Sequence, residues 1–585
     1  MLTDFLPTTR KELDLRGWDD VDIILFSGDA YVDHPSFGMA VIGRTLEAAG
    51  YRVAIVPQPD WHGDYRDFKK LGRPRLFFAI TAGSMDSMVN HYTANRRKRS
   101  DDAYSPDGRF GMRPDYCTNV YTKILKELYP DVPVVIGGIE ASMRRLCHYD
   151  YWQDKILPSI LVTSGADVLV YGMGEKPMVE LAQRAENHKS LIGVNQTAYL
   201  AKEEPYEGVK LHSYEQCVRN KRDYAENFRE IEEQSNAWHG ERLIEPTGNR
   251  FVVVEPMNPP MTAEEIDRSF DLPYQRLPHP KYKGKTIPAF EMIKFSVNMH
   301  RGCFGGCSFC TISAHQGKQV SSRSKESIMN EVRKVAAMPD FKGYLSDLGG
   351  PSANMYGMHG KNTALCEVCK RPSCLQPAIC KNLNQDFGPL LDIYRSVDAL
   401  PQIKKSFIGS GIRYDLMSEE YGREVITRHV SGRLKVAPEH TSPHVLKMMR
   451  KPSFDLFRRF ARFFEQVNDE AGLNQQLIPY FISSHPGCTT EDMAELALLT
   501  KQLNFKLEQV QDFTPTPMTL STVMYYTGLD PYTMEPVFVA RSKDDKLKQR
   551  MFFFWYKHEE HSAIRRELNR IHRPDLVQYL LRRKQ

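Results

Sequence analysis

Seven of the eleven cysteines in this 585-residue chain lie between residues 303 and 380, and they form two groups. Thiolates are soft ligands that suit iron–sulfur clusters or zinc. The first group has the spacing C-x3-C-x2-C and consists of Cys303, Cys307 and Cys310. Ordinary electron-transfer clusters take four cysteines, so three thiolates around a cubic cluster would leave one iron open to a small molecule. A zinc site completed by His300 or His315 is the alternative.

The second group follows closely in the sequence, with the spacing C-x2-C-x4-C-x5-C. It consists of Cys366, Cys369, Cys374 and Cys380. Such a concentration of thiols indicates a second metal site. Zinc would close it as a structural tetrahedron, and an auxiliary iron–sulfur cluster is the other candidate. The spacing of the four cysteines is compatible with either zinc or an iron–sulfur cluster.

The elements that position these residues begin with an α/β region over residues 1–200. Near-continuous apolar runs, which are typical of strands buried on both faces, predict parallel strands at residues 21–27, 52–56, 76–80, 132–136 and 167–171. Residues 38–50 have the pattern of a helix between the first two strands. We therefore expect a Rossmann-like, doubly wound domain, followed by a charged and then Pro-rich connecting subdomain over residues 201–285.

A second α/β region covers residues 286–540. Its strands are predicted at residues 293–299, 343–348, 405–409, 433–437 and 476–483, and Ser324 is a suitable N-cap for its first helix. Repeated βα units predict a partial or full (β/α) barrel, in which chemistry sits at the carboxyl ends of the strands. The first cysteine group follows the first strand, and residues 366–380 form a Cys-rich insertion after the second.

The last segment, residues 541–585, is basic and helical with interleaved aromatic side chains. Packing of amphipathic helices on the barrel is favoured over contact with RNA. The formal net charge of +5 is small for this length and does not argue for nucleic acid. An odd number of cysteines is no disulfide framework. With no membrane-length apolar run and no secretion signal, the expected location is cytoplasmic, with no membrane partner.

The cysteine loop reads FSVNMHRGCFGGCSFCTIS, with Phe309 inside its last gap. This loop resembles that of the radical S-adenosylmethionine (radical SAM) superfamily, and over most of its length the chain is similar to the YgiQ-type family. The resemblance implies a 4Fe–4S cluster on the first three cysteines, with S-adenosylmethionine as a second cofactor. Gly349 and Gly350 would meet the methionyl amino group. Ser410, Arg413 and Glu439 would hold the remaining polar atoms.

The resemblance also implies a reaction. A radical SAM enzyme reductively cleaves S-adenosylmethionine to form a 5′-deoxyadenosyl radical, and an external donor such as flavodoxin or ferredoxin supplies the electron. The resemblance does not identify the substrate. Analogy with relatives that resemble methylthiotransferases suggests that the enzyme modifies RNA or protein. The alternative is a non-enzymatic RNA-interaction protein stabilised by zinc or iron–sulfur, which predicts structural metal in both cysteine groups.

The amino-terminal domain resembles the cobalamin-binding domain of some relatives at residues 136–138 and 167–175. A cobalt-ligating loop places His two residues after Asp and Gly three residues after His. In this chain Asp33, His34 and Gly38 miss both spacings by one residue. We therefore interpret His34 as a hydrogen-bonded loop residue, and any cobalamin would bind in the crevice without that ligand.

Overall fold

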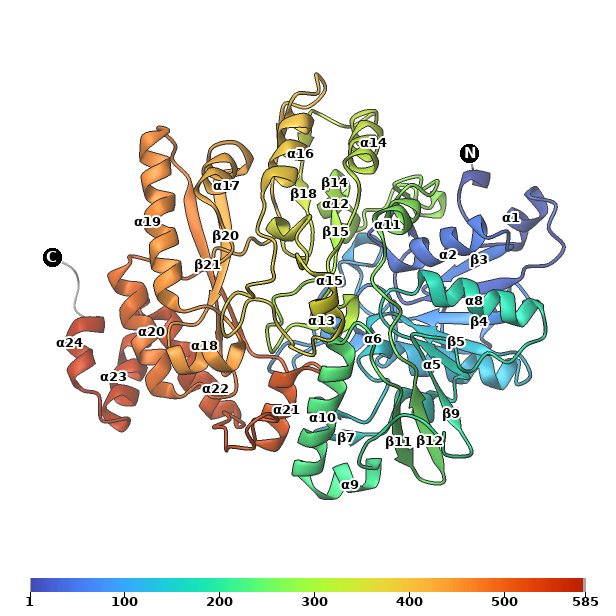
Figure 1. Ribbon diagram of the computed structural model, residues 1–585, viewed down its shortest axis with the longest axis horizontal. Helices are drawn as coiled ribbons and strands as arrows, with labels where there is room; N and C mark the ends of the chain where they lie inside the picture. The colour runs from blue at the N-terminus through green and yellow to red at the C-terminus, as the bar shows by residue number, and fades with distance from the viewer. Residues whose placement is uncertain (1, 582–585) are drawn as a thin grey trace.

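The apolar runs of the first 170 residues form the parallel part of one large sheet in the computed structural model, which describes residues 2–581 (Figure 1). Its strands are β1 (Ile23–Ser27), β3 (Val53–Pro57), β4 (Phe77–Thr81), β5 (Val134–Gly137) and β8 (Val168–Val170). They lie in the order β3-β1-β4-β5-β8, so the direction of winding reverses between β1 and β4. This is a flavodoxin-like doubly wound arrangement, which confirms the predicted fold class.

Alternate side chains of each strand enter two different cores. Ile23 and Leu25 of β1 pack with α2 (Gly38–Ala48) and α8 (Glu175–Glu186). Ile24 and Phe26 face the other core, together with α5 (Cys117–Leu128). Helices therefore cover both faces, and the strands are apolar throughout because neither face meets water.

The sheet continues beyond β8 with antiparallel pairing. Four more strands take part: β9 (Thr197–Ala201), β12 (Arg250–Val254), β11 (Leu243–Thr247) and β10 (Val209–Lys210). The sheet therefore runs to Val254, past the domain boundary predicted at residue 200. Within the region predicted to connect the domains, helix α10 (Lys221–Asn236) also packs against α21 (Leu520–Thr527) of the second half. The division into domains itself stays a prediction.

The second half contains short parallel ladders. They pair β14 (Ser296–Asn298) with β18 (Asp347–Gly349), β17 (Tyr344–Leu345) with β19 (Lys405–Ser406), and β21 (Gln476–Ser483) with both β20 (Arg433–Glu439) and β22 (Gln509–Asp512). Single hydrogen bonds continue between ladders, from Leu348 N–H to Phe407 O and from Ile408 N–H to His429 O. Within residues 2–581 no ladder returns from β22 to β14. The barrel is therefore the partial form of the prediction and does not close.

Helices cover this open barrel on one side (Figure 1). They are α14 (Lys325–Ala336), α16 (Gly388–Asp398), α19 (Phe454–Glu470) and α20 (Thr490–Gln502), and their buried faces share one core with the strands. Helix α14 begins as predicted, because the Ser324 side chain accepts a hydrogen bond from Ser327 N–H at 3.1 Å. The ladders from β14 to β19 are short because the strands pass quickly into the glycine-rich loops of the candidate site.

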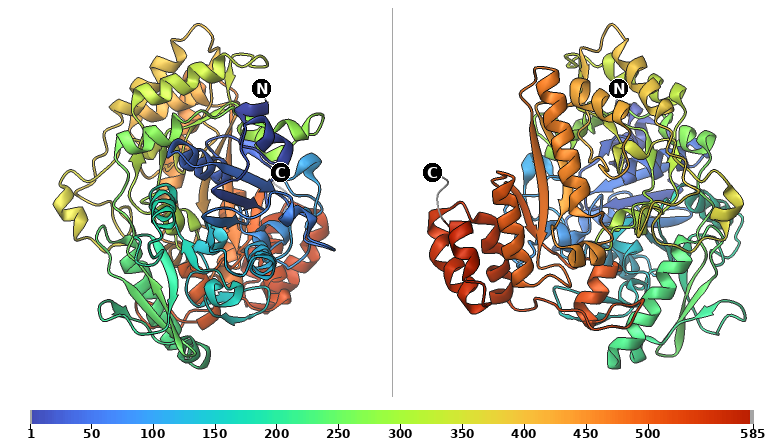
Figure 2. Two further views of the ribbon diagram at one scale, coloured as in Figure 1. Left: turned by 90° about the vertical axis from the view of Figure 1, so that its right-hand side faces the viewer. Right: turned by 60° about the vertical axis from the view of Figure 1, so that its left-hand side comes forward.

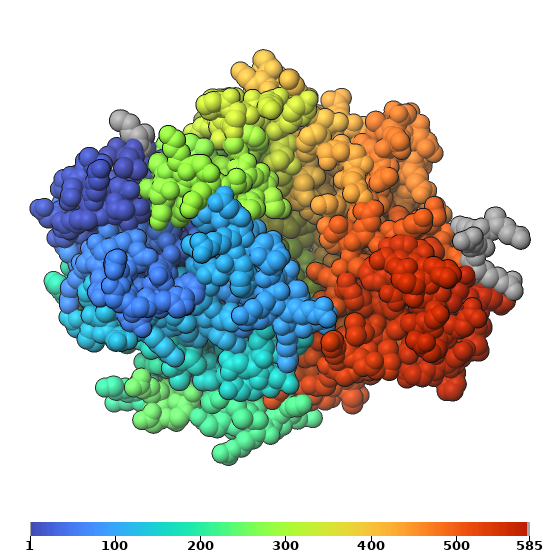
Figure 3. All heavy atoms as spheres, turned by 180° about the vertical axis from the view of Figure 1, so that it is seen from behind, coloured from blue at the N-terminus to red at the C-terminus, as the bar shows by residue number. Residues whose placement is uncertain are grey.

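The first and last of the three carboxy-terminal helices pack on α20, and the middle one packs on the last (Figure 2). They are α22 (Lys543–Arg550), α23 (His561–Arg570) and α24 (Asp575–Leu581), and Phe552, Phe553 and Leu568 are buried there. Amphipathic packing is therefore found up to residue 581, whereas residues 582–585 of the predicted segment lie outside the described part. Figure 3 shows the amino- and carboxy-terminal parts at opposite ends of the molecule. Across residues 2–581, each helix is too short or too polar to span a lipid bilayer.

Candidate iron–sulfur and S-adenosylmethionine site

The first cysteine loop leaves the carboxyl end of β14 and is closed by a small hairpin. Strand β15 (His300–Arg301) pairs antiparallel with β16 (Ser321–Ser322). Cys303 N–H donates to Gly317 O at 3.1 Å. Gly302 has φ +87°, and a Cβ there would lie 2.0 Å from Gln319 O. Only glycine fits at this position, so the local sequence fixes where the loop turns.

The three cysteines of this loop lie near enough to interact electrostatically. All three are reduced and half-buried, and Cys310 N–H donates to Cys307 O at 3.1 Å. Burial raises the pKa of Cys310 to about 12, and the nearby Cys307 and Cys303 thiols raise it further. A bound metal cluster would remove this penalty, because thiolates are stabilised by the metal that they ligate.

Arg413 supplies positive charge beside the cysteines. Its Nη1 donates to Cys307 Sγ at 3.5 Å, and its guanidinium also forms an ion pair with Asp415 at 2.7 Å. Although burial lowers the pKa of Arg413, Asp415 holds it above the usual range. A Cβ at Gly305 would lie 2.9 Å from Arg413 Nη1 and 3.4 Å from Cys303 Sγ, so this glycine allows the arginine to approach the loop.

Glu439 ends β20 on the same side of the loop. Its φ is +68°, and it is buried 3.9 Å from Lys451 Nζ. Burial raises the pKa of Glu439, while Lys451 and Arg413 lower it. Glu439 in turn raises the pKa of Cys310. The predicted residues Arg413 and Glu439 are therefore both close enough to interact with the cysteine loop.

The glycine turn after β18 lies next to the cysteine strand. Asn298 of β14 is paired with Gly349 of β18. A Cβ at Gly349 would lie 2.4 Å from Ser410 Oγ, and a Cβ at Gly350 would lie 2.4 Å from the His300 ring. A larger residue at either position would have to displace one of these side chains. The structure brings Gly349, Gly350 and Ser410 together, as the resemblance implied, and their ligand roles stay predictions.

Three supporting residues were not among the predicted site residues. Asp347 accepts hydrogen bonds from Gly409 N–H at 2.8 Å and Ser410 N–H at 3.0 Å, and so joins two loops. The Asn354 side chain accepts from Arg413 N–H at 2.8 Å and donates to Arg413 O at 2.9 Å. Asp415 was detectable as an opposite charge two residues after Arg413. Asn354 had no local signal, because its partner is distant in the sequence.

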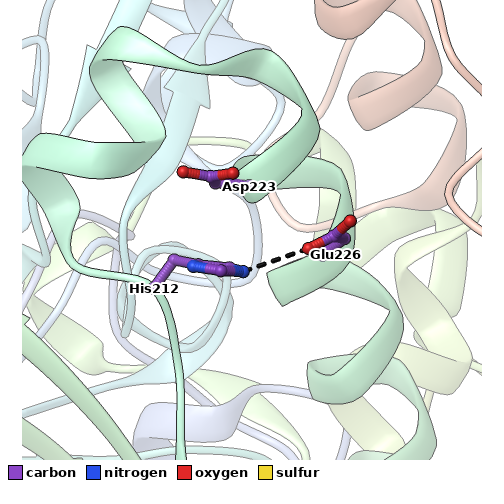
Figure 4. A group of neighbouring side chains, drawn as sticks. All are labelled: His212, Asp223 and Glu226. Carbon is purple, nitrogen blue, oxygen red and sulfur yellow. Dashed lines mark hydrogen bonds and ion pairs between the residues drawn. The ribbon is translucent and has the colours of Figure 1, made fainter.

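The two histidines of the zinc alternative for the first group have other contacts, and that alternative stays a prediction. His300 packs on Gly350, and His315 Nδ1 lies 3.1 Å from Ser142 Oγ. Within residues 2–581, the set of three or more metal-type ligand atoms that all lie within 4.8 Å of one another is His212, Asp223 and Glu226 (Figure 4). That group is a partly exposed ion-pair network, in which His212 Nε2 lies 3.1 Å from Glu226.

The second cysteine group also assembles. Burial raises the pKa of Cys374 to about 11, Lys318 lowers it, and the nearby thiols of Cys380, Cys369 and Cys366 raise it further. The four side chains are half-buried and reduced. The predicted second array is therefore one spatial group, and its metal stays a prediction.

A cavity of about 430 Å³ lies between the amino-terminal sheet and α13 (Thr311–Gln316), the helix that begins after Cys310. Loops after the parallel strands line one side with Asp29, Gly83 and Gly138, while Ile312 lines the other. The strand order reverses between β1 and β4, and ligands of doubly wound sheets bind at such a point.

His34 does not line this cavity among the described residues. It is buried, its Nδ1 accepts a hydrogen bond from Ser36 N–H at 3.1 Å, and its ring contacts the edges of Phe37 and Phe290. It has the contacts of a packed loop histidine.

Comparison with known proteins places this site in a family. The model of the radical SAM N-terminal domain matches residues 5–296, and a domain of unknown function, DUF3362, matches residues 508–581. A UPF0313 protein of Bacteroides thetaiotaomicron is 63% identical, covering 99% of this chain and 98% of the relative. A UPF0313 protein of Methanocella arvoryzae is 44% identical, and the match covers 98% of this chain and 96% of the relative.

These matches define the class as radical SAM, which confirms the predicted superfamily. More specifically, the chain belongs to the UPF0313 family. Among solved structures, it is similar to TsrM, a radical SAM methyltransferase from Kitasatospora setae solved with cobalamin and a [4Fe-4S] cluster bound. The TM-score is 0.50 at 14% identity, covering 86% of this chain and 77% of TsrM. At that identity the likeness supports the fold.

Proposed function

We propose that the chain is an enzyme that reductively cleaves S-adenosylmethionine at a 4Fe–4S cluster held by Cys303, Cys307 and Cys310. The observation that carries the proposal is the loop itself. It gathers three reduced thiols, and Arg413 lies against one of them at 3.5 Å. Three thiolates are one fewer than a cubic cluster needs, so one iron would be free for the cofactor.

A 4Fe–4S cluster held there would supply, when reduced, the one electron that splits S-adenosylmethionine into methionine and a 5′-deoxyadenosyl radical. The chain's own residues position the cofactor. The Gly349 and Gly350 backbone would face the methionyl amino group. Ser410, Arg413 and Glu439 would hold the other polar atoms, and the burial of Arg413 and Glu439 would help to exclude water there.

We propose that the substrate enters through the cavity of about 430 Å³, since α13 links that cavity directly to Cys310. RNA or protein is the proposed substrate class, and flavodoxin or ferredoxin the proposed electron donor. Both proposals come from the resemblance to characterised radical SAM enzymes.

The TsrM structure contains cobalamin, which makes this cofactor a second candidate occupant of the cavity. The position at the switch point of the sheet favours it, whereas the packed His34 does not offer a cobalt ligand. We therefore expect that any absorbance change of hydroxocobalamin on binding persists in His34→Ala. It should disappear in Ile139→Trp, which fills the cavity, but not in Ile192→Trp on the exposed surface. Loss of binding in His34→Ala would contradict this assignment.

The test of the main proposal is formation of 5′-deoxyadenosine. The protein is reconstituted anaerobically with iron and sulfide, reduced with dithionite and incubated with S-adenosylmethionine. Wild type and the control Cys117→Ala, a buried cysteine outside both groups, should form 5′-deoxyadenosine. The Cys303→Ala, Cys307→Ala, Cys310→Ala triple variant should not. An iron-loaded wild type that leaves S-adenosylmethionine intact would overturn the proposal.

A further inference from the structure

We propose that Cys366, Cys369, Cys374 and Cys380 hold a second iron–sulfur cluster, rather than zinc, through which electrons reach the first. The electron-transfer part rests on the function proposed above, whereas the identity of the metal does not.

The spacing of the sulfur atoms favours a polynuclear cluster. Around one zinc ion, with Zn–S distances of about 2.3 Å in a tetrahedron, the sulfurs would lie within roughly 3.8 Å of one another. Within residues 2–581, no three of these four sulfurs lie within 4.8 Å of one another. Thiolates that ligate different irons of one cluster are farther apart than thiolates on a single ion.

The loop is built around the sulfurs. Gly360 is bridged to Leu383, and a Cβ at Gly360 would lie 2.2 Å from Cys366 Sγ. Asn382 Nδ2 donates to the same sulfur at 3.4 Å. Hydrogen bonds to cluster sulfurs are one means by which proteins tune reduction potential.

A buried lysine faces the group. Lys318 is 3% exposed, and its Nζ donates to Arg371 O at 2.7 Å and lies 3.8 Å from Cys369 Sγ. Within residues 2–581, the printed side-chain contacts of Lys318 are with a sulfur and a backbone carbonyl, and none is with a carboxylate. A buried ammonium needs a compensating negative charge, and an anionic thiolate cluster would supply it.

The second loop is directly hydrogen-bonded to the first. Cys374 N–H donates to Phe304 O at 3.0 Å, and Phe304 is the residue after Cys303. The buried Ser373 Oγ donates to Gly305 O at 2.8 Å. One hydrogen bond therefore connects a ligand of the second site to a neighbour of a ligand of the first. This is a short route for an electron.

The outer rim of the second loop fits a protein donor. Val368 and Leu365 are 78% and 56% exposed. Lys370, Arg371 and Lys381 are exposed beside the array and outnumber the one exposed acid between the two apolar residues, Glu367. A basic rim with apolar contacts complements an acidic one-electron carrier. In the proposed step, the reduced carrier loses one electron and the first cluster gains it by way of the second. No bond forms or breaks.

The first experiment is metal analysis of the reconstituted triple variant Cys303→Ala, Cys307→Ala, Cys310→Ala. We expect iron and inorganic sulfide in equal amounts, with an absorbance band that disappears when Cys366, Cys369, Cys374 and Cys380 are also replaced by alanine. Stoichiometric zinc, or no metal, in a folded triple variant would overturn the proposal. If the triple variant does not fold, the iron content of the second-site quadruple alanine variant tests the proposal instead. We expect it to be lower than that of wild type, and an equal iron content would overturn the proposal. These measurements do not depend on S-adenosylmethionine cleavage.

The second experiment compares reductants for the second-site quadruple variant. We expect 5′-deoxyadenosine formation to be lost with reduced flavodoxin but retained with titanium(III) citrate, a small reductant that can reach the first cluster directly. Equal loss with both reductants would show a structural role and overturn the relay, and so would full activity with both. Wild type must form 5′-deoxyadenosine with both reductants. A wild type that is inactive with both would therefore show that the proposed function, and not the relay, has failed.

Discussion

Replacing Gly306 by alanine should push the two cysteine loops apart. Gly306 has φ +62°, and a Cβ there would lie 2.3 Å from Pro372 O and 2.9 Å from Ser373 Cβ. Left-handed backbone costs an L-residue about 1–2 kcal/mol. Non-bonded heavy atoms prefer about 3.5–4.0 Å, so the loops would have to separate by roughly 1 Å. Such overpacking costs about 1–3 kcal/mol, for a total of about 2–5 kcal/mol.

Gly357→Ala is the matched control. Gly357 has φ +72°, but the nearest atom to a Cβ there is Pro389 Cβ at 3.9 Å. It should therefore show only the backbone penalty of about 1–2 kcal/mol. The assays are thermal unfolding and iron content after anaerobic reconstitution. Gly306→Ala should have the lower Tm and lose iron, whereas Gly357→Ala keeps it. Equal Tm and iron content in the two variants would refute the reasoning.

Three further predictions follow from buried polar contacts. Ser373→Ala leaves Gly305 O without its donor and should lower stability by about 1–3 kcal/mol, seen as a lower Tm. Arg413→Leu leaves the buried Asp415 carboxylate without its ion-pair partner and should lower the free energy of unfolding by about 3–5 kcal/mol. The double variant with Asp415→Leu should recover part of that loss, as measured by urea unfolding. Burial lowers the pKa of His148 to about 3 from its usual 6.5, so the unfolded chain binds more protons between those values. Stability should therefore fall as pH drops below about 6.5, by about 1.4 kcal/mol per pH unit for this group, and His148→Gln should flatten that slope.

The parallel sheet and its helices could be predicted because their signals are local. The apolar runs from Ile23 to Val170 and the cap at Ser324 depend on nearby residues alone. By contrast, β10 and β22 are short and largely polar, and only their pairing with neighbours makes them strands. The extension of the first sheet runs mainly through β9 and β12, whose residues are largely apolar, but their antiparallel pairing beyond β8 could not be predicted from local pattern.

In the candidate site, too, the features with a local sequence signal could be predicted and the long-range contacts could not. Close spacing and the superfamily resemblance identified the cysteines, and the structure brings both predicted groups together. The contacts around them depend on residues distant in sequence. Lys318 has the appearance of an ordinary surface lysine in the sequence, but the fold buries it against the loop of Cys369. Likewise, the bond from Cys374 to Phe304 exists only because two loops meet at the ends of neighbouring strands.

The most direct test of the central claim is electron paramagnetic resonance of the reduced protein with and without S-adenosylmethionine. The second-site quadruple alanine variant is used, so that only the first cluster contributes. The account predicts a cluster signal whose g-values shift when S-adenosylmethionine is added, because the cofactor binds the open iron. A fully loaded first cluster whose spectrum is unchanged by saturating S-adenosylmethionine would contradict it.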